Sequence, residues 1–298
     1  MNRQLKADLV LLAITFVWGS TFVLMKNALS DIPTLKFMAL RFSVAFISLI
    51  ILFNKRLLKI NRRSLLYSFI MGILLYGGLT LQAAGLNYTT ASKSAFITGL
   101  SVVLVPVLSA IILRKMPKTS AVIGVGLAFT GMIMLTSDAS LSFNFGDLLT
   151  LLAAFCFALE IIFIDKFTNI EDPVILGVLQ VGFAALFSTA IALIIKSPAI
   201  VYSENVILAI LITAIPATAL ALVAQSVVQK FTSPTHTALV FAAEPVFGAL
   251  FASLIPNTLG IRELLPIQGI LGCGLILFGM LIAELSIDRL KIALKKWI

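Results

Sequence analysis

Residues 225–245 read QSVVQKFTSPTHTALVFAAEP, a polar turn between two apolar runs. The stretch contains the only histidine of the chain, His236, and it ends on Glu244 followed at once by Pro245. A similar stretch lies 143 residues earlier (225 − 82), where Gln82–Phe96 reads QAAGLNYTTASKSAF. In this register the aligned pairs include Gln82/Gln225, Thr89/Thr232, Lys93/His236 and Ala95/Ala238. A polar turn that occurs twice between apolar runs indicates a duplicated chain.

The composition excludes an ordinary soluble protein. Of the 298 residues, 60% are hydrophobic and only 12% are charged, whereas a soluble domain carries about 25% charged residues. A helix that crosses a bilayer needs about 20 mostly apolar residues, so the chain has room for about ten. The net charge of +9 does not indicate nucleic-acid binding, because the basic residues form short clusters between apolar runs.

Short polar connectors divide the chain into apolar segments. Because backbone polar groups inside a bilayer have no water to bond, we predict that each segment is a helix. The expected fold is an all-α integral membrane protein with ten transmembrane helices, at Leu9–Met25, Pro33–Phe53, Leu65–Leu86, Ser94–Leu113, Ser120–Thr136, Phe145–Ile164, Pro173–Ile195, Val206–Val228, Thr235–Ile255 and Leu264–Glu284.

The duplication extends over the whole chain and predicts two five-helix repeats, residues 1–140 and 141–298. Its further matches are Asp8-Leu9 with Asp147-Leu148, Pro33 with Pro173, Gly124 with Gly272 and Gly131 with Gly279. Because five is odd, the second repeat enters from the opposite face, and the repeats are inverted. Inverted repeats are typical of secondary transporters that bind substrate near the membrane midplane. The glycines pack either within the chain or between chains.

The basic residues predict the orientation, because cytoplasmic loops carry an excess of Lys and Arg. With both termini in the cytoplasm, sixteen of the 22 Lys and Arg residues fall on the cytoplasmic side. The other six are Lys26, Lys36, Arg41, Lys93, Lys196 and Arg262. We therefore expect both termini to be cytoplasmic.

Charged groups within the segments are costly and mark candidate functional positions. Helix rise places Arg41 roughly 12 Å and Glu244 roughly 14 Å into their segments, while Glu160 lies nearer the cytoplasmic end of its own. Glu244 is a candidate for binding a proton, a cation or a substrate amine, or for a protonated structural contact. Glu160 is either a similar carboxyl or a residue that reaches the cytoplasm. Arg41 either binds an anionic group or ties its helix down through an ion pair.

Uncharged side chains supply the other candidates. Trp18 lies roughly 14 Å into the first segment, away from the interfaces where Trp is enriched, and forms either a cavity wall or core packing. Gln82 and Gln225 either hold a polar substrate or bond neighbouring helices. The predicted substrate-binding residues are Trp18, Thr21, Tyr76, Gln82, Glu160, Gln225 and Glu244. We expect His236 to be a surface or capping residue.

Neither catalysis nor cofactor binding is indicated by the sequence. Cys156 and Cys273 both lie inside apolar segments and have no metal-ligand spacing. No nucleophile–base pair is evident, and the glycines of residues 124–131 are wrongly spaced for a dinucleotide loop. We therefore expect no enzyme activity, no cofactor and no metal.

The chain resembles the drug/metabolite transporter superfamily, EamA type, over nearly its whole length. The resemblance rests on residues 18–22 (WGSTF), residues 40–42 (LRF), residues 232–235 (TSPT) and residues 244–247 (EPVF). It implies a carrier in a bacterial cytoplasmic membrane, often an exporter of amino acids or other metabolites. It also implies a cavity lined by the first, third, fourth, sixth, eighth and ninth segments. That set leaves Arg41 outside, and the absence of paired basic residues on those segments argues against a phosphorylated substrate.

The expected function is a secondary carrier, acting as an exporter, that moves a small polar or amphiphilic metabolite such as an amino acid by alternating access. The expected partners are this substrate and the lipid bilayer. Proton coupling, exchange and facilitated diffusion remain alternatives, as do a monomer and a homodimer. One rival is an intramembrane lipid-modifying enzyme, which would need His, Asp or Ser groups converging at one interface. Another is a sensor or scaffold, for which the short loops leave no output domain.

Overall fold

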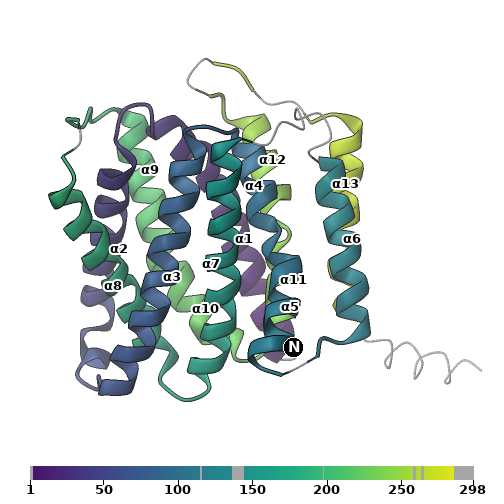
Figure 1. The fold of residues 1–298 in the computed structure, drawn as a ribbon, viewed down its shortest axis with the longest axis horizontal. Helices are drawn as coiled ribbons and strands as arrows, with labels where there is room; N and C mark the ends of the chain where they lie inside the picture. Colours follow the sequence, from purple (N-terminus) through teal and green to yellow (C-terminus); the bar gives the residue numbers. More distant parts are fainter. Residues whose placement is uncertain are drawn as a thin grey trace, which may run out of the picture.

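The computed structural model describes residues 3–114, 116–135, 144–196, 198–257, 260–262 and 265–284. All regular structure in these residues is helical (Figure 1). Eight helical segments are long and apolar enough to cross a bilayer, and two apolar helices, Thr119–Met134 and Ile267–Ala283, are shorter. The predicted all-helical membrane fold is confirmed. The count of ten crossings stays a prediction, because two of the helices fall below the usual length of about 20 residues.

Six helices are continuous, one is kinked and three segments are interrupted. The continuous helices are α1 (Arg3–Ala28), α3 (Arg62–Leu86), α6 (Thr119–Leu135), α7 (Phe145–Thr168), α8 (Pro173–Ile194) and α13 (Ile267–Glu284). Helix α2 (Thr34–Leu57) is kinked at Phe53, whose φ of −120° and ψ of 19° are not helical. The interrupted segments are α4 (Ala91–Gly99) with α5 (Ser101–Ile112), α9 (Glu204–Ala214) with the π-helix η1 (Ile215–Leu220) and α10 (Ala221–Gln229), and α11 (Pro234–Phe241) with α12 (Glu244–Leu254).

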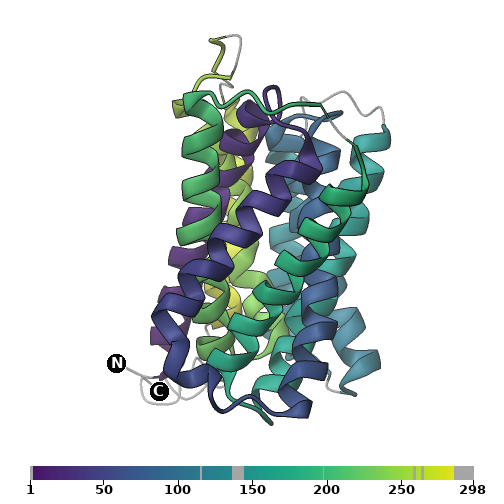
Figure 2. The same cartoon turned by 90° about the vertical axis from the view of Figure 1, so that its left-hand side faces the viewer.

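The two halves run in opposite directions and are interleaved. Helix α1 begins at the end of the bundle where the N-terminus lies, and α7 begins at the other end (Figure 1). The turns gather at these same two ends when the molecule is turned by 90° (Figure 2). Helices of the first half pack on helices of the second: α1 on α12, α2 on α8, α3 on α7 and α6 on α13. The interface between the halves is therefore the centre of the protein.

Exposure of the side chains is reversed relative to a soluble protein. Large apolar side chains such as Ile51 and Leu193 are 69% and 80% exposed, while polar groups such as Gln180 and Thr218 are fully buried. An apolar outer surface of this kind suits contact with lipid, and it leaves the polar chemistry inside the bundle.

Two helix interruptions occupy equivalent positions in the halves. Helix α5 begins at Ser101 and α12 begins at Glu244, which are 143 residues apart (244 − 101), the offset of the duplication. In the second half Pro245 lacks a backbone N–H, which explains an interruption at that point. Each interruption falls within a long apolar segment, Ala91–Ile112 in the first half and Pro234–Leu254 in the second.

Glycines join α6 to α13 within the chain. A Cβ added to Gly131 would lie 2.5 Å from the carbonyl oxygen of Gly272, and one added to Gly124 would lie 2.6 Å from that of Gly279. In contrast, a Cβ on Gly126 would meet no atom within 4 Å among the described residues. The paired glycines therefore let two helix backbones touch, as small residues do in membranes.

This contact predicts a difference between neighbouring glycines. Gly131→Leu should separate α6 from α13 and destabilise the protein by about 1–3 kcal/mol, the usual cost of overpacking. Gly126→Leu is the matched control and should leave the unfolding temperature in detergent nearly unchanged. Equal effects of the two substitutions would contradict the packing described.

Candidate functional site

A cavity of about 50 Å³ lies between the two halves. Its walls come from α1, α2, α3, the α4–α5 segment, α7, the η1–α10 segment and the α11–α12 segment. Six of the seven predicted substrate-binding residues line it: Trp18, Thr21, Gln82, Glu160, Gln225 and Glu244. The structure thus brings these residues together, while their binding of a substrate stays a prediction.

Tyr76 is the exception, and the structure places it outside the cavity wall. Leu75, Leu79 and Gln82 line the cavity from α3, at the i, i+4, i+7 spacing of one helix face. Tyr76 is rotated by about 100° from that face, and its ring lies 6.5 Å from Phe42 and 6.2 Å from Phe187. Tyr76 thus lies off the face of α3 that lines the cavity, and its binding of a substrate stays a prediction.

Trp18 is held against the cavity by a backbone carbonyl of the π-helix. Its Nε1 donates a hydrogen bond of 2.7 Å to the carbonyl oxygen of Ala217, and its ring packs edge-on against Phe241 at 4.9 Å. The N–H of Ala221, which in an α-helix would bond Ala217, donates to the carbonyls of Pro216 and Thr218 instead. The π-turn therefore makes a mid-membrane acceptor available to the indole.

Arg41 is a cavity residue that the resemblance did not include. It lines the cavity from α2 and is only 2% exposed. Its Nε donates to the hydroxyl of Thr218 at 2.9 Å, and its Nη1 lies 3.3 Å from the thioether of Met25. The set of cavity helices implied by the resemblance was thus incomplete. Pro216, placed within an apolar segment, was the available signal that the backbone near Thr218 is irregular.

Glu160 and Glu244 face the cavity without a basic partner. Both are buried, 5% and 9% exposed. Among the described residues, neither carboxyl forms an ion pair, and Oε1 of Glu160 has no hydrogen-bond partner. Because an unpaired buried carboxylate is strongly unfavourable, each carboxyl needs a proton, a cation or a donor that the protein itself does not supply.

The two matching glutamines take part in different local networks. Nε2 of Gln82 donates to the hydroxyl of Thr98 at 3.0 Å. Nε2 of Gln225 donates to Gln229 at 3.1 Å, and Gln229 in turn donates to the carbonyl of Ile161 at 2.6 Å. Oε1 of Gln225 is buried and has no hydrogen-bond partner in the described structure. This oxygen can therefore accept a hydrogen bond from a ligand.

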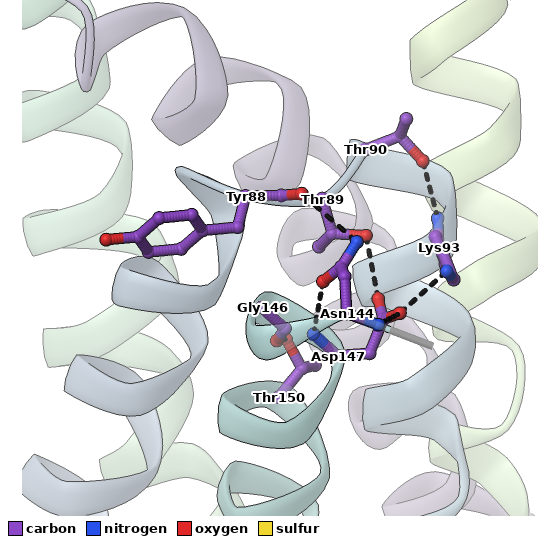
Figure 3. Close-up of polar contacts among 8 residues, drawn as sticks. All are labelled: Tyr88, Thr89, Thr90, Lys93, Asn144, Gly146, Asp147 and Thr150. Carbon is purple, nitrogen blue, oxygen red and sulfur yellow. Dashed lines mark hydrogen bonds and ion pairs between the residues drawn. The ribbon is translucent and has the colours of Figure 1, made fainter. Parts of the chain in front are cut away.

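A polar cluster closes the bundle at the end opposite the N-terminus (Figure 3). Nζ of Lys93 lies 2.6 Å from Oδ2 of Asp147, which is fully buried. Oδ1 of Asp147 accepts from the hydroxyl of Thr89 at 2.9 Å. Asn144 and Asp147 also cap the first turn of α7 reciprocally. The cluster joins the start of α4, in the first half, to the start of α7, in the second.

The other end of the bundle carries the equivalent pair. Nε2 of His236, at the start of α11, lies 3.2 Å from Oδ1 of Asp8 on α1. The sequence register aligns His236 with Lys93 and Asp8 with Asp147, so each half contributes the nitrogen-bearing side chain to one pair and the carboxyl group to the other. His236 is therefore part of an interhelical contact. It also lies in the first turn of α11, where its backbone N–H donates to Oγ of Ser233.

Comparison with known proteins agrees with this architecture. A profile of the EamA-like transporter family matches residues 5–137 and again residues 144–284. The chain belongs to this family. The resemblance inferred from the sequence is confirmed, and the chain is a multi-pass membrane protein of a transporter family.

Named relatives and a solved structure add to this family assignment. An uncharacterized transporter of Archaeoglobus fulgidus is 33% identical over 285 residues, covering 96% of this chain and 88% of that protein. The uncharacterized transporter YoaV of Bacillus subtilis is 22% identical, and the match covers 97% of this chain and 100% of YoaV. A protein of known crystal structure superposes with a TM-score of 0.75 at 19% identity, covering 96% of this chain and 98% of its own. The last likeness concerns the fold alone.

The Lys93–Asp147 pair predicts a stability difference. Because Asp147 is fully buried, Asp147→Asn should destabilise the protein by about 3–5 kcal/mol, the usual effect of breaking a buried ion pair. The exposed pair between Arg56 and Asp172 is the control, and Arg56→Gln should change stability by less than about 1 kcal/mol. Thermal unfolding in detergent measures both, and a larger effect at Arg56 would contradict the assignment.

Proposed function

We propose that the protein is a secondary carrier that moves a small polar or amphiphilic metabolite across the membrane by alternating access. The observation that carries this proposal is the cavity, which lies between inverted halves and takes its walls from both. Carriers built from inverted repeats bind substrate at this place, near the midplane.

The chemistry of the cavity suits a polar substrate with an apolar part. Trp18, Phe157 and Phe241 provide aromatic walls, while Glu160 and Glu244 provide carboxyl groups. Polar groups inside a membrane are retained where they contact a substrate, an ion or a water-filled path. The same carboxyls are candidates for carrying a proton in exchange for the substrate. We also propose the orientation predicted from the basic residues, with the N-terminus in the cytoplasm, and transport in the direction of export.

Two rival functions lack comparable support. A lipid-modifying enzyme would need converging nucleophile, base and acid groups, whereas the chain's single histidine, His236, lies against Asp8 and is not on the cavity wall. A sensor would need an output surface. Neither rival accounts for two unpaired carboxyls in a central cavity.

Counterflow across proteoliposomes tests the proposal. Vesicles loaded with one compound of a metabolite panel should accumulate its labelled form only when the protein is present. Glu244→Gln should reduce the rate roughly tenfold or more, because a charged or proton-donating contact contributes about 1.5–3 kcal/mol. If Glu244→Gln leaves transport unchanged with and without a pH gradient, this carboxyl is not the coupling site. Absence of exchange for every panel compound would contradict the carrier function.

Alternating access also needs a barrier at each end of the cavity, and the two equivalent pairs occupy the required places. Lys93 lies five residues before the cavity residue Thr98, and Asp147 lies ten before Phe157. His236 lies five residues before Phe241, and Asp8 lies ten before Trp18. Both pairs thus join helices that line the cavity, at the same distance along the chain but at opposite ends. We infer that Lys93–Asp147 and Asp8–His236 are the two gates.

Thiol labelling tests the gates without knowledge of the substrate. In a protein with Cys156→Ser and Cys273→Ser, a reporter Leu79→Cys in the cavity wall is exposed to a membrane-impermeant maleimide from either side. Lys93→Gln should increase labelling from the end opposite the N-terminus. Asp8→Asn should increase labelling from the N-terminal end, and Arg56→Gln, which breaks an exposed pair, should change neither. Increases on the same side, or on no side, would refute the assignment.

A further inference from the structure

Arg41 is the one basic side chain on the described cavity wall, and its surroundings leave its charge uncompensated. Among the described residues its contacts are neutral: the hydroxyl of Thr218 and the thioether of Met25. No described carboxylate oxygen lies within 4 Å of its nitrogens. A guanidinium stays protonated in proteins, so a full positive charge stands beside the cavity.

A structural role alone does not explain this arrangement. Structural arginines inside a membrane pair with an acid or with several carbonyls, and a buried charge without such a partner is costly. Nη2 of Arg41 has no acceptor in the described structure, and Nη1 has only a sulfur, which is a weak one. The terminal edge of the guanidinium, which suits a planar carboxylate, therefore has donors to spare.

The local backbone fixes the direction of this edge. The hydroxyl of Thr218, in the π-turn, donates to the carbonyl of Thr213 in α9 at 2.6 Å, so its lone pairs are directed to accept from Nε of Arg41. The same turn holds the indole of Trp18 through Ala217. One irregular turn thus orients an aromatic wall and a cation toward a common space, and π-turns recur at functional sites.

We propose that Arg41 is the anion-binding residue of the cavity and that the transported compound carries a carboxylate. This inference rests on the proposed carrier function and adds the chemical class of its substrate. A carboxylate accepts two parallel hydrogen bonds from a guanidinium and neutralises it. A phosphate group carries more charge than the single guanidinium supplies, and Glu160 and Glu244 line the same cavity. A monoanion therefore fits better than a dianion.

Binding of matched compounds tests the proposal. The probes are alanine, leucine and phenylalanine, their primary amides, their deaminated acids, and their phosphonate analogues. Binding to the purified protein in detergent is followed by the ligand-dependent shift of its unfolding temperature. In at least one series the carboxylates, with or without the amine, should bind roughly 10- to 100-fold more tightly than the amide, as expected for a charged hydrogen-bonded contact.

Variants show whether Arg41 causes the preference. Arg41→Gln should abolish the preference for acid over amide, and Arg41→Lys should keep part of it, since the charge remains and the planar fork is lost. Thr218→Val keeps the charge and the side-chain shape, so it provides a test if Arg41→Gln does not fold; it should weaken the preference. Arg56→Gln is the control and should leave it unchanged.

Several results would overturn the proposal. They are equal binding of acids and amides, a preference for phosphonates, and an acid preference that survives in Arg41→Gln. These outcomes differ from failure of the carrier function. If amides exchange as fast as acids in counterflow, Arg41 is not the selecting residue although the protein is a carrier. If a bound acid is not exchanged at all, the carrier function fails although the anion site stands.

Discussion

The cavity depends on a π-turn at the centre of one membrane helix. Pro216 has no N–H to continue the hydrogen-bond ladder, and the turn that results shifts the N–H of Ala221 away from Ala217. A backbone carbonyl in the middle of a bilayer would be unfavourable without a partner, and the indole of Trp18 supplies one across the interface between the halves. The same turn presents Thr218 to Arg41. The missing N–H of Pro216 thus accounts for one turn that positions both the indole of Trp18 and the guanidinium of Arg41.

The interruptions between α4 and α5 and between α11 and α12 extend this principle. They occur at Ser101 and Glu244, both of which line the cavity. The sequences at these points differ, since only the second half has a proline directly after the break. The position of the interruption was therefore retained in the duplicated architecture while its chemistry diverged. Glu244 supplies a carboxyl where the first half supplies only a hydroxyl.

Most of the cavity residues could be predicted from the sequence, because burying a polar side chain in a membrane is energetically unfavourable. Glu244 and Trp18 near mid-depth and the two glutamines within apolar segments were identifiable because burying such groups in a membrane is unfavourable, and all of them line the cavity. The position of Tyr76 off the cavity-lining face of α3 was not foreseen, because the free-energy cost of burial does not give the angular position of a side chain around its helix. Arg41 was noticed but separated from the cavity, because its contact with Thr218 depends on a π-turn. The hydropathy of a sequence does not show where a helix changes from α-type to π-type hydrogen bonding.

The two end pairs of the inverted duplication differ in the number of contacts that their carboxyl groups make. Asp147 accepts hydrogen bonds from Thr89 and from the backbone of Asn144 in addition to its contact with Lys93. Both oxygens of Asp8 lack a hydrogen-bond partner in the described structure, although Nε2 of His236 lies 3.2 Å away. The pair near the N-terminus is thus less strongly held than the pair at the other end. The two ends of the bundle therefore differ in the strength of their contacts, although the duplication gives them equivalent pairs.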